Sequence, residues 1–186
     1  MDPSKIRIIR EITSSDASSI FEVELDGQEY AFKLFHDNGD PGYTPNSRDL
    51  NRFRCELNAY QKLHTSGVCA RGFVPIYHGS IDRIDPAAFH PALQHFAQDK
   101  LNPSAILLEY FPHAESLNCV NYSDALYPQV IEGTLVWIDF DVATTFTDCD
   151  PEQLARCDYE LALVKGFAEA LMHDQVQGLP PNTKFY

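Results

Sequence analysis

The stretch that decides the fold is residues 20–35, IFEVELDGQEYAFKLF, in a chain of 186 residues. Residues 20–25 alternate apolar and acidic side chains, which is the period-two pattern of a half-buried strand. Asp26-Gly27 predicts a tight turn, because this pair suits the loop of a two-residue hairpin. Residues 28–35 then return as the partner strand. The segment therefore predicts an antiparallel hairpin.

The flanking sequence extends this hairpin into a sheet with a helix. Residues 6–12, IRIIREI, are rich in β-branched side chains and predict a strand before the hairpin, joined to it by the small polar residues 13–19. A long loop at 36–47 precedes a predicted helix at 48–64, in which Leu50, Phe53, Leu57 and Tyr60 recur at helical spacing. We expect Ser47 to be the N-cap of this helix.

The remainder of the chain predicts further strands and one long helix. Residues 73–82 indicate a strand pair or bent strand, 83–103 an irregular segment with three prolines, and 105–111 a buried strand. A weak helical pattern covers 121–131, an apolar strand is predicted at 135–142, and Asp150-Pro151 starts a helix over 151–173. The order of elements predicts an α+β fold, a mostly antiparallel sheet with one helix packed against it.

Charge and cysteine content narrow the class of protein. With 14 Lys+Arg against 27 Asp+Glu the net charge is −13, which disfavours binding to nucleic acid or anionic membranes. No apolar run approaches the roughly 20 residues of a membrane helix, and the start of the chain lacks a signal-peptide pattern. The five cysteines are odd in number and form no C-x-x-C. We expect a reduced, cytoplasmic or nuclear protein.

Three charged residues stand in apolar surroundings and predict a common site. Lys33 interrupts the third strand, and Glu56 lies on the apolar face of the 48–64 helix. A buried ammonium and a buried carboxylate each need a partner, so we expect these two to pair. Asp139, at the end of an apolar segment, could hold a divalent cation against phosphate. A purely structural ion pair, with Asp139 as a turn cap, is the alternative that stays open.

These residues and their order resemble the protein-kinase-like superfamily, which includes protein, choline and aminoglycoside kinases. Tyr30-Ala31-Phe32-Lys33 is similar to the Val-Ala-Ile-Lys strand, and Glu56 to the helix glutamate that pairs with that lysine. Residues 107–111, LLEYF, resemble the hinge that holds adenine, and 138–141, IDFD, resemble the metal-binding Asp-Phe-Gly. Short fungal kinase-like proteins are similar too, including the ending LPPNTK at 179–184.

The resemblance implies a nucleotide site and a division of the chain. Lys33, Glu56, Glu109, Phe111 and Asp139 would bind nucleotide, with ATP and Mg²⁺ as cofactors and Asp139 as the metal ligand. Residues 1–111 would form a kinase-like N-terminal lobe. Residues 112–186 would be a truncated, mainly helical remnant of the C-terminal lobe, continuous with the first part as one structural unit.

The departures from the family pattern decide the expected function. The catalytic loop His-x-Asp-x-x-x-x-Asn should lie between the hinge and the metal aspartate, yet only 30 residues separate Glu109 from Asp139 and no such string occurs there. No glycine occurs in residues 13–19, where the phosphate-covering loop should be. We therefore expect no ordinary kinase activity and no catalytic residue, and we interpret the chain as a pseudokinase.

Such a pseudokinase would act by binding. Its apolar faces at 105–111 and 151–173 would need cover, which predicts a homodimer or a protein partner. The alternative is an enzyme that uses the same fold for other small-molecule chemistry, or for weak phosphotransfer with Asp141 or Asp148 as the base.

Overall fold

A computed structural model describes residues 2–114, 136–146 and 150–178. The chain divides into two compact units. The first comprises Met1–Pro112 with Val136–Thr145, and the second comprises His113–Leu135 with Phe146–Tyr186. The predicted α+β class is confirmed, since the first unit is built on a five-stranded antiparallel sheet and the described residues include two α-helices.

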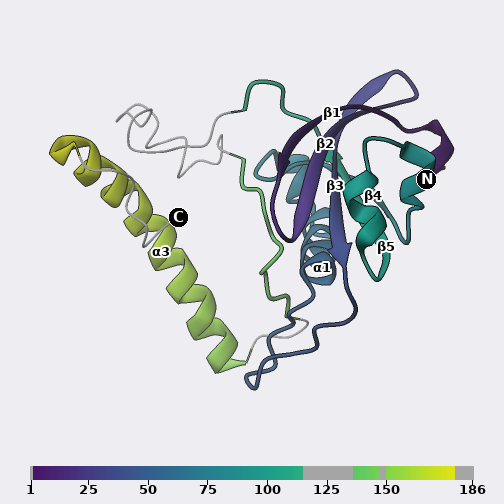
Figure 1. The fold of residues 1–186 in the computed structure, drawn as a ribbon. Helices are drawn as coiled ribbons and strands as arrows, with labels where there is room; N and C mark the ends of the chain where they lie inside the picture. Colours follow the sequence, from purple (N-terminus) through teal and green to yellow (C-terminus); the bar gives the residue numbers. More distant parts are fainter. Residues whose placement is uncertain (1, 115–135, 147–149, 179–186) are drawn as a thin grey trace. The chain divides into compact units, whose positions relative to one another are not determined.

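The sheet has the strand order β1-β2-β3-β5-β4 (Figure 1). Its strands are β1 (Arg7–Ser14), β2 (Ser18–Leu25), β3 (Gln28–Asp37), β4 (Tyr77–Ile81) and β5 (Leu101–Glu109). The predicted hairpin is present: Leu25 pairs with Gln28, and Asp26 and Gly27 have φ of 50° and 82°. Two consecutive positive φ angles are what a type I′ turn demands, and the Asp-Gly pair supplies them at low cost. β1 carries two register shifts, between Ile8 and Arg10 and between Glu11 and Thr13.

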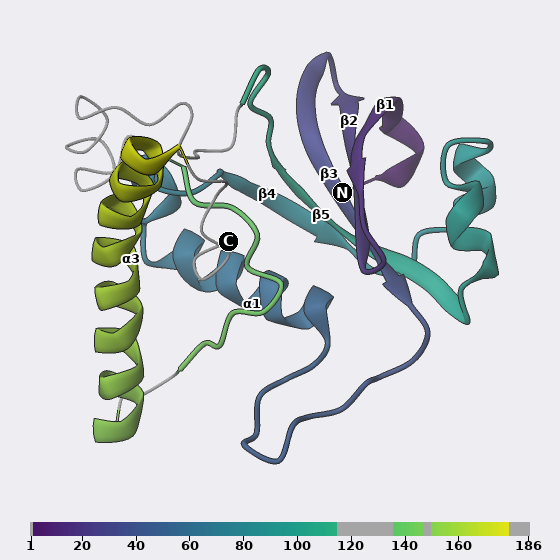
Figure 2. The same cartoon turned by 60° about the vertical axis from the view of Figure 1, so that its left-hand side comes forward.

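Helix α1 (Arg52–Thr65) covers one face of the sheet, as Figure 2 shows. Its N-cap is Asn51, whose side chain accepts a hydrogen bond from the Arg54 amide at 2.9 Å. The prediction of Ser47 as N-cap is therefore wrong. Ser47 lies in a turn with φ of 59°, and its amide donates to the Thr44 carbonyl. Serine and asparagine are both favoured at the N-cap, so Ser47 and Asn51 were both possible caps. Ser47 lies inside the loop that the bridge between Tyr43 and Asp49 closes, and the helix therefore starts four residues later than predicted.

Apolar residues fill both sides of the sheet. Under α1 lies a cluster of Phe35, Tyr60, Ile106 and Leu108. The opposite face holds a larger cluster, covered by two short 3₁₀ helices at Pro86–Phe89 and Gln94–Gln98. The buried members of that larger cluster are Ile6, Phe21, Val23, Phe32, Leu34, Ile84, Leu93, Phe96, Ala105 and Leu107. The segment predicted as irregular at 83–103 thus forms a packing layer of the core.

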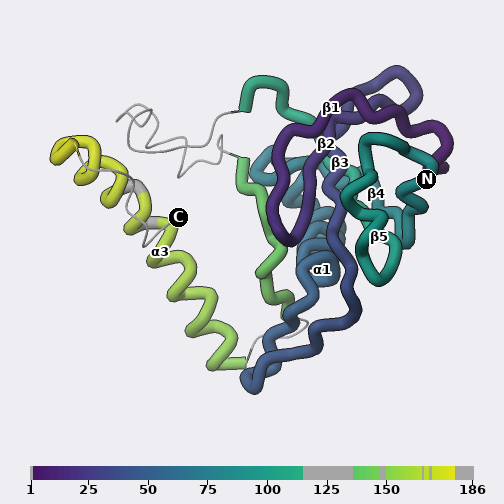
Figure 3. The backbone as a smooth tube through the Cα atoms, in the orientation of Figure 1, coloured from purple at the N-terminus to yellow at the C-terminus, as the bar shows by residue number. Residues whose placement is uncertain are grey.

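Other sequence predictions need correction. For the segment 73–82, a strand pair is wrong and the alternative of one bent strand agrees with β4, which has a register shift between Tyr77 and Gly79. The strand predicted at 105–111 is β5, which starts at Leu101 and ends at Glu109. Residues 136–142 are not a strand, because Asp139 has φ of 70° and breaks the extended backbone. Figure 3 shows residues 136–145 instead as an irregular segment along α1. The helix proposed at 121–131 lies outside the described residues.

The second unit contributes helix α3 (Pro151–Gln177) to the described chain. The prediction of Asp150 as N-cap with Pro151 as first helical residue is confirmed: the Asp150 side chain accepts from the Gln153 amide, and the Gln153 side chain accepts from the Asp150 amide. This capping box satisfies two amides that the first turn leaves unpaired. The helix ends at Gly178, which has φ of 63°. Among the described residues no helix is both long and apolar enough to span a bilayer.

Candidate functional site

The ammonium of Lys33 joins three parts of the first unit. Lys33 Nζ lies 2.6 Å from Glu56 Oε2 on α1 and 2.8 Å from Asp139 Oδ1 in the segment 136–145. The side chains of Lys33 and Glu56 are only 6% and 1% exposed, whereas that of Asp139 is 64% exposed. Lys33 and Glu56 are thus a buried ion pair, and the Asp139 carboxylate beside them is open to solvent.

Local sequence explains why Lys33 and Glu56 face each other. In β3 the neighbours Phe32 and Leu34 belong to the cluster on the far face, so the alternation of the strand turns Lys33 toward α1. On α1, Glu56 follows Phe53 by three residues and precedes Tyr60 by four, and both aromatic residues belong to the cluster under the helix. The prediction that strand and helix bring these charges together is realised in the geometry.

Burial and charge act in opposite directions on this pair. Burial raises the pKa of Glu56 to about 7, although the neighbouring Lys33 ammonium pulls it down. Burial alone would favour the neutral amine of Lys33, but the carboxylates of Glu56 and Asp139 outweigh it and raise the pKa of the ammonium. Lys33 thus stays positively charged at neutral pH, and it is the cation around which the acids gather.

The segment that carries Asp139 is held to α1 on both sides of that residue. Asp141 is 8% exposed. Its Oδ2 accepts a hydrogen bond at 2.5 Å from Nη1 of Arg52, the first residue of α1. The Phe140 ring meets the Tyr60 ring edge-on, with 5.3 Å between centroids. Upstream, the Trp137 amide donates to the Phe73 carbonyl at 2.9 Å. These contacts fix the position of Asp139 relative to Lys33.

The carboxylates here fit a cation only if another molecule supplies further ligands. Asp139 offers an exposed carboxylate, whereas Glu56 is directed at Lys33 and Asp141 at Arg52. In the part of the chain that the structure describes, no three His, Cys, Asp or Glu side chains cluster as a metal site. Mg²⁺ commonly binds through one or two carboxylates, water and substrate phosphate, so Asp139 suits a shared Mg²⁺ and not a protein-only site.

The predicted hinge residues lie apart from this group. Glu109 pairs with Tyr30 and Lys33 with Ile106, which is three residues, or about 10 Å, along the ladder. The Glu109 amide donates to the Ile76 carbonyl at 2.9 Å, and its Oε2 accepts from the Ile76 amide at 3.1 Å. Phe111 follows the end of β5 and is half-buried. The structure thus brings together Lys33, Glu56 and Asp139, and places Glu109 and Phe111 beyond them.

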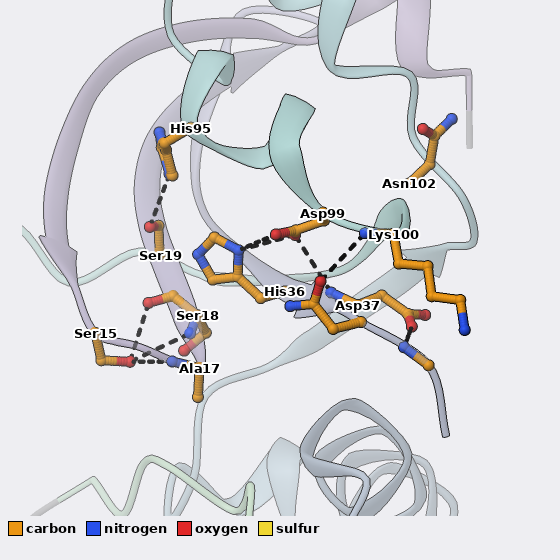
Figure 4. A network of polar contacts seen from close by, with 12 residues as sticks. Ser15, Ala17, Ser18, Ser19, His36, Asp37, His95, Asp99, Lys100 and Asn102 are labelled. Atoms are coloured by element: carbon orange, nitrogen blue, oxygen red, sulfur yellow. Dashed lines mark hydrogen bonds and ion pairs between the residues drawn. The ribbon is translucent and has the colours of Figure 1, made fainter. Parts of the chain in front are cut away.

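A second polar group lies on the other side of β3, and no sequence pattern predicted it. His36 Nδ1 contacts Asp99 Oδ2 at 2.8 Å, and the Asp37 amide donates to the same oxygen at 3.3 Å (Figure 4). Ser19 Oγ lies 3.1 Å from His95 Nε2. These bonds fasten β2 and β3 to the layer at 83–99. The contact between His36 and Asp99 could not be predicted, because Asp99 is 63 positions from His36 and lies in a segment without periodicity.

A cavity of about 240 Å³ opens beside this group, between the turn at 15–17 and the start of α1. Ala17, Phe35, His36, Arg52 and Phe53 are among its lining residues. Lys33, Glu56 and Asp139 do not line it, although the ring of Phe35, which does, has its centre 5.2 Å from Lys33 Nζ. The cavity is therefore a neighbour of the Lys33 site and not a part of it.

Comparison with known proteins adds no family to this description. No protein-family model matches the chain, and no curated protein matches it either.

Proposed function

We propose that this chain is a kinase-like protein without ordinary phosphotransfer activity, and that it acts by binding, with a nucleotide site at Lys33, Glu56 and Asp139. The observation that carries the proposal is the double contact of Lys33 Nζ with Glu56 Oε2 and Asp139 Oδ1, at 2.6 and 2.8 Å. In kinases a lysine on the third strand pairs with a helix glutamate and binds phosphate, and a further aspartate holds Mg²⁺.

The elements that deliver these side chains support the proposal. Lys33 lies on β3, Glu56 on the helix that follows it, and Asp139 after the last strand. Asp139 would share Mg²⁺ with the phosphates, and Lys33 would neutralise phosphate charge. Residues near Glu109 and Phe111 lie about 10 Å along the sheet, a separation that a nucleoside phosphate can bridge.

The absence of phosphotransfer rests on the sequence between Glu109 and Asp139. It contains no aspartate in the His-x-Asp pattern that would accept the proton of an acceptor hydroxyl. Asp141, a candidate replacement base, is buried and bonded to Arg52. The other candidate, Asp148, lies outside the described residues. The known parts of the site thus favour binding over chemistry.

Calorimetric titration with Mg-ATP tests the proposal. We expect saturable binding by the wild type, no binding by Lys33→Ala, and binding that no longer depends on Mg²⁺ for Asp139→Asn. Asp26→Asn is the matched control, because Asp26 also has positive φ and an exposed carboxylate, 70% against 64% for Asp139. Circular dichroism must show that each variant is folded.

Two results would contradict the proposal. If folded wild-type protein binds neither ATP nor ADP, the Lys33–Glu56 contact is a structural ion pair only. If the wild type turns over ATP and Asp139→Asn does not, the chain is an enzyme and the non-catalytic part of the proposal is wrong.

A further inference from the structure

The sequence of α3 contains a heptad repeat of apolar residues, and part of this repeat is exposed to solvent. Starting at Leu154, positions a and d of consecutive heptads are all apolar: Leu154, Cys157, Leu161, Val164, Ala168 and Leu171. We call this set the heptad seam. Apolar residues at a and d form one stripe along a helix, which is the geometry that pairs helices in a coiled coil.

The N-terminal half of the heptad seam faces solvent. Leu154 is 52% exposed and Leu161 is 59% exposed, and Cys157 between them is an exposed free thiol. Every residue from Leu154 to Ala162 is exposed. Farther along, Val164 is half-buried and Leu171 is fully buried. The open part of the seam therefore runs from Leu154 to Val164.

A helical segment that buries so little needs stabilisation from elsewhere. Most helical stability in proteins comes from packing an apolar stripe against other parts of the structure. The capping box at Asp150 and the Arg156–Glu152 pair, at 2.6 Å, help the first turns only modestly. Burial of the exposed Leu154 and Leu161 side chains would therefore stabilise this helix further.

The charges that flank the heptad seam select a second copy of the chain. With Leu154 at a, Glu160 occupies a g position and Lys165 the following e position. In a parallel dimer, g of one helix faces the next e of its partner, so the register sets glutamate against lysine on both sides of the seam. The seam is thus complementary to itself in charge as well as in shape.

We propose that α3 is a dimerisation helix, which pairs in parallel and in register with α3 of a second copy. The pair would bury Leu154 and Leu161 at consecutive a layers and bring the two Cys157 thiols together at the d layer between them. The open seam is short, so we expect a weak dimer. This inference does not depend on nucleotide binding.

Analytical ultracentrifugation of the full chain over a micromolar concentration series, under reducing conditions, tests the dimer. We expect the wild type to shift from monomer to dimer, and Leu161→Glu to weaken the dimer by more than about tenfold. Tyr159→Glu is the matched control, because Tyr159 is 62% exposed on the same helix but occupies an f position off the seam. It should dimerise as the wild type does.

Three results would overturn the proposal. A wild type that stays monomeric throughout the series leaves the seam to another occupant, such as the chain's first unit. Dimerisation that survives Leu161→Glu places the interface elsewhere. Equal weakening by Tyr159→Glu would mean that any charge added to the helix has this effect.

Cross-linking tests the orientation. Diamide, which oxidises two thiols to a disulfide and takes up their hydrogens, should convert the wild-type dimer to a covalent dimer on a non-reducing gel. Cys119 and Cys149 lie outside the described residues, so both are first replaced by serine. In that background Cys157→Ser should abolish the covalent dimer, since Cys55 and Cys69 are buried. A dimer that diamide does not link through Cys157 would rule out the parallel register. Charge exchange gives a second check: Glu160→Lys should weaken the dimer, and adding Lys165→Glu should restore it.

Discussion

Lys33 and Glu56 form a buried ion pair, with 2.6 Å between Nζ and Oε2 and side chains that are 6% and 1% exposed. Each charge is costly in the core without the other, because neither finds water to solvate it. The pair links the middle strand of the sheet to α1. Its loss should therefore affect the stability of the first unit as well as any ligand bound there.

Substitution of Lys33 by methionine should lower the free energy of unfolding by about 3 kcal/mol, because Glu56 would be left buried and unpaired. The double variant Lys33→Met, Glu56→Leu should recover part of this loss, since it leaves no orphaned charge. Urea unfolding followed by circular dichroism measures both. Lys62→Met, at an exposed position of the same helix, is the control and should be near neutral. A Lys33→Met protein as stable as the control would contradict the assignment.

Stability should depend on pH through Glu56. Burial raises the pKa of Glu56 from 4.5 to about 7, so the folded state holds this proton more tightly than the unfolded state. The stabilisation is fully present below pH 4.5 and is lost as the pH rises through 7, a change of about 3 kcal/mol at about 1.4 kcal/mol per pH unit. Glu56→Gln cannot titrate and should lack this decline, as urea unfolding at several pH values would show.

The difference between wild type and Glu56→Gln isolates this effect. Burial lowers the pKa of His78, which makes stability rise with pH below 6.5, but this contribution is the same in both proteins. The raised pKa of Lys33 adds stability that is lost only as the pH rises above 10.5, outside the window. A wild-type-minus-variant difference that stays constant between pH 4.5 and 7 would refute the prediction.

The Arg52–Asp141 contact should hold the segment 136–145 against α1. Arg52→Ala leaves the 8% exposed Asp141 carboxylate without this donor, at a cost of about 1–3 kcal/mol. Trp137 is the only tryptophan in the chain and lies four residues from Asp141, so its fluorescence reports on this segment. We expect greater quenching by acrylamide in Arg52→Ala than in the wild type. Arg48→Ala, an exposed arginine in the loop before α1, should leave quenching unchanged.

The start of α1 can be tested with two single substitutions. Asn51→Ala removes the side-chain oxygen that accepts from the Arg54 amide and should cost about 1 kcal/mol. Ser47→Ala should cost much less, because Ser47 is four residues ahead of the cap. Thermal unfolding of both variants, side by side, decides which residue caps the helix. A larger loss for Ser47→Ala would contradict the assignment of Asn51.

Local patterns and unpaired charges were the informative parts of the sequence. The hairpin at 20–35 was predictable because its register is set by Asp26-Gly27 and by alternation within a few residues. The pairing of Lys33 with Glu56 was predictable because a charge on an apolar face needs a partner, however distant in sequence. Asp139 is largely exposed, so this argument does not extend to it; it was a candidate through its place after an apolar segment and through the resemblance.

Features decided by tertiary contacts were not predictable. The layer at 83–99 packs through isolated residues such as Leu93 and Phe96, which leave no periodic signal. Residues 136–142 have the composition of a strand, yet bonds to Phe73 and Arg52 hold them in an irregular path with Asp139 in a left-handed conformation. In each case long-range contacts override the local preference.

The outer strand β1 determines how one edge of the sheet meets other chains. β1 is an edge strand that is exposed along almost all its length, but its two register shifts spoil the even row of amides and carbonyls that a foreign strand would need. Its Arg7 and Arg10 side chains, paired with Glu24 and Glu22, place charge along the same edge. Irregular, charged edges discourage intermolecular β-pairing. The β1 edge of the sheet is thereby a poor template for a strand of another copy.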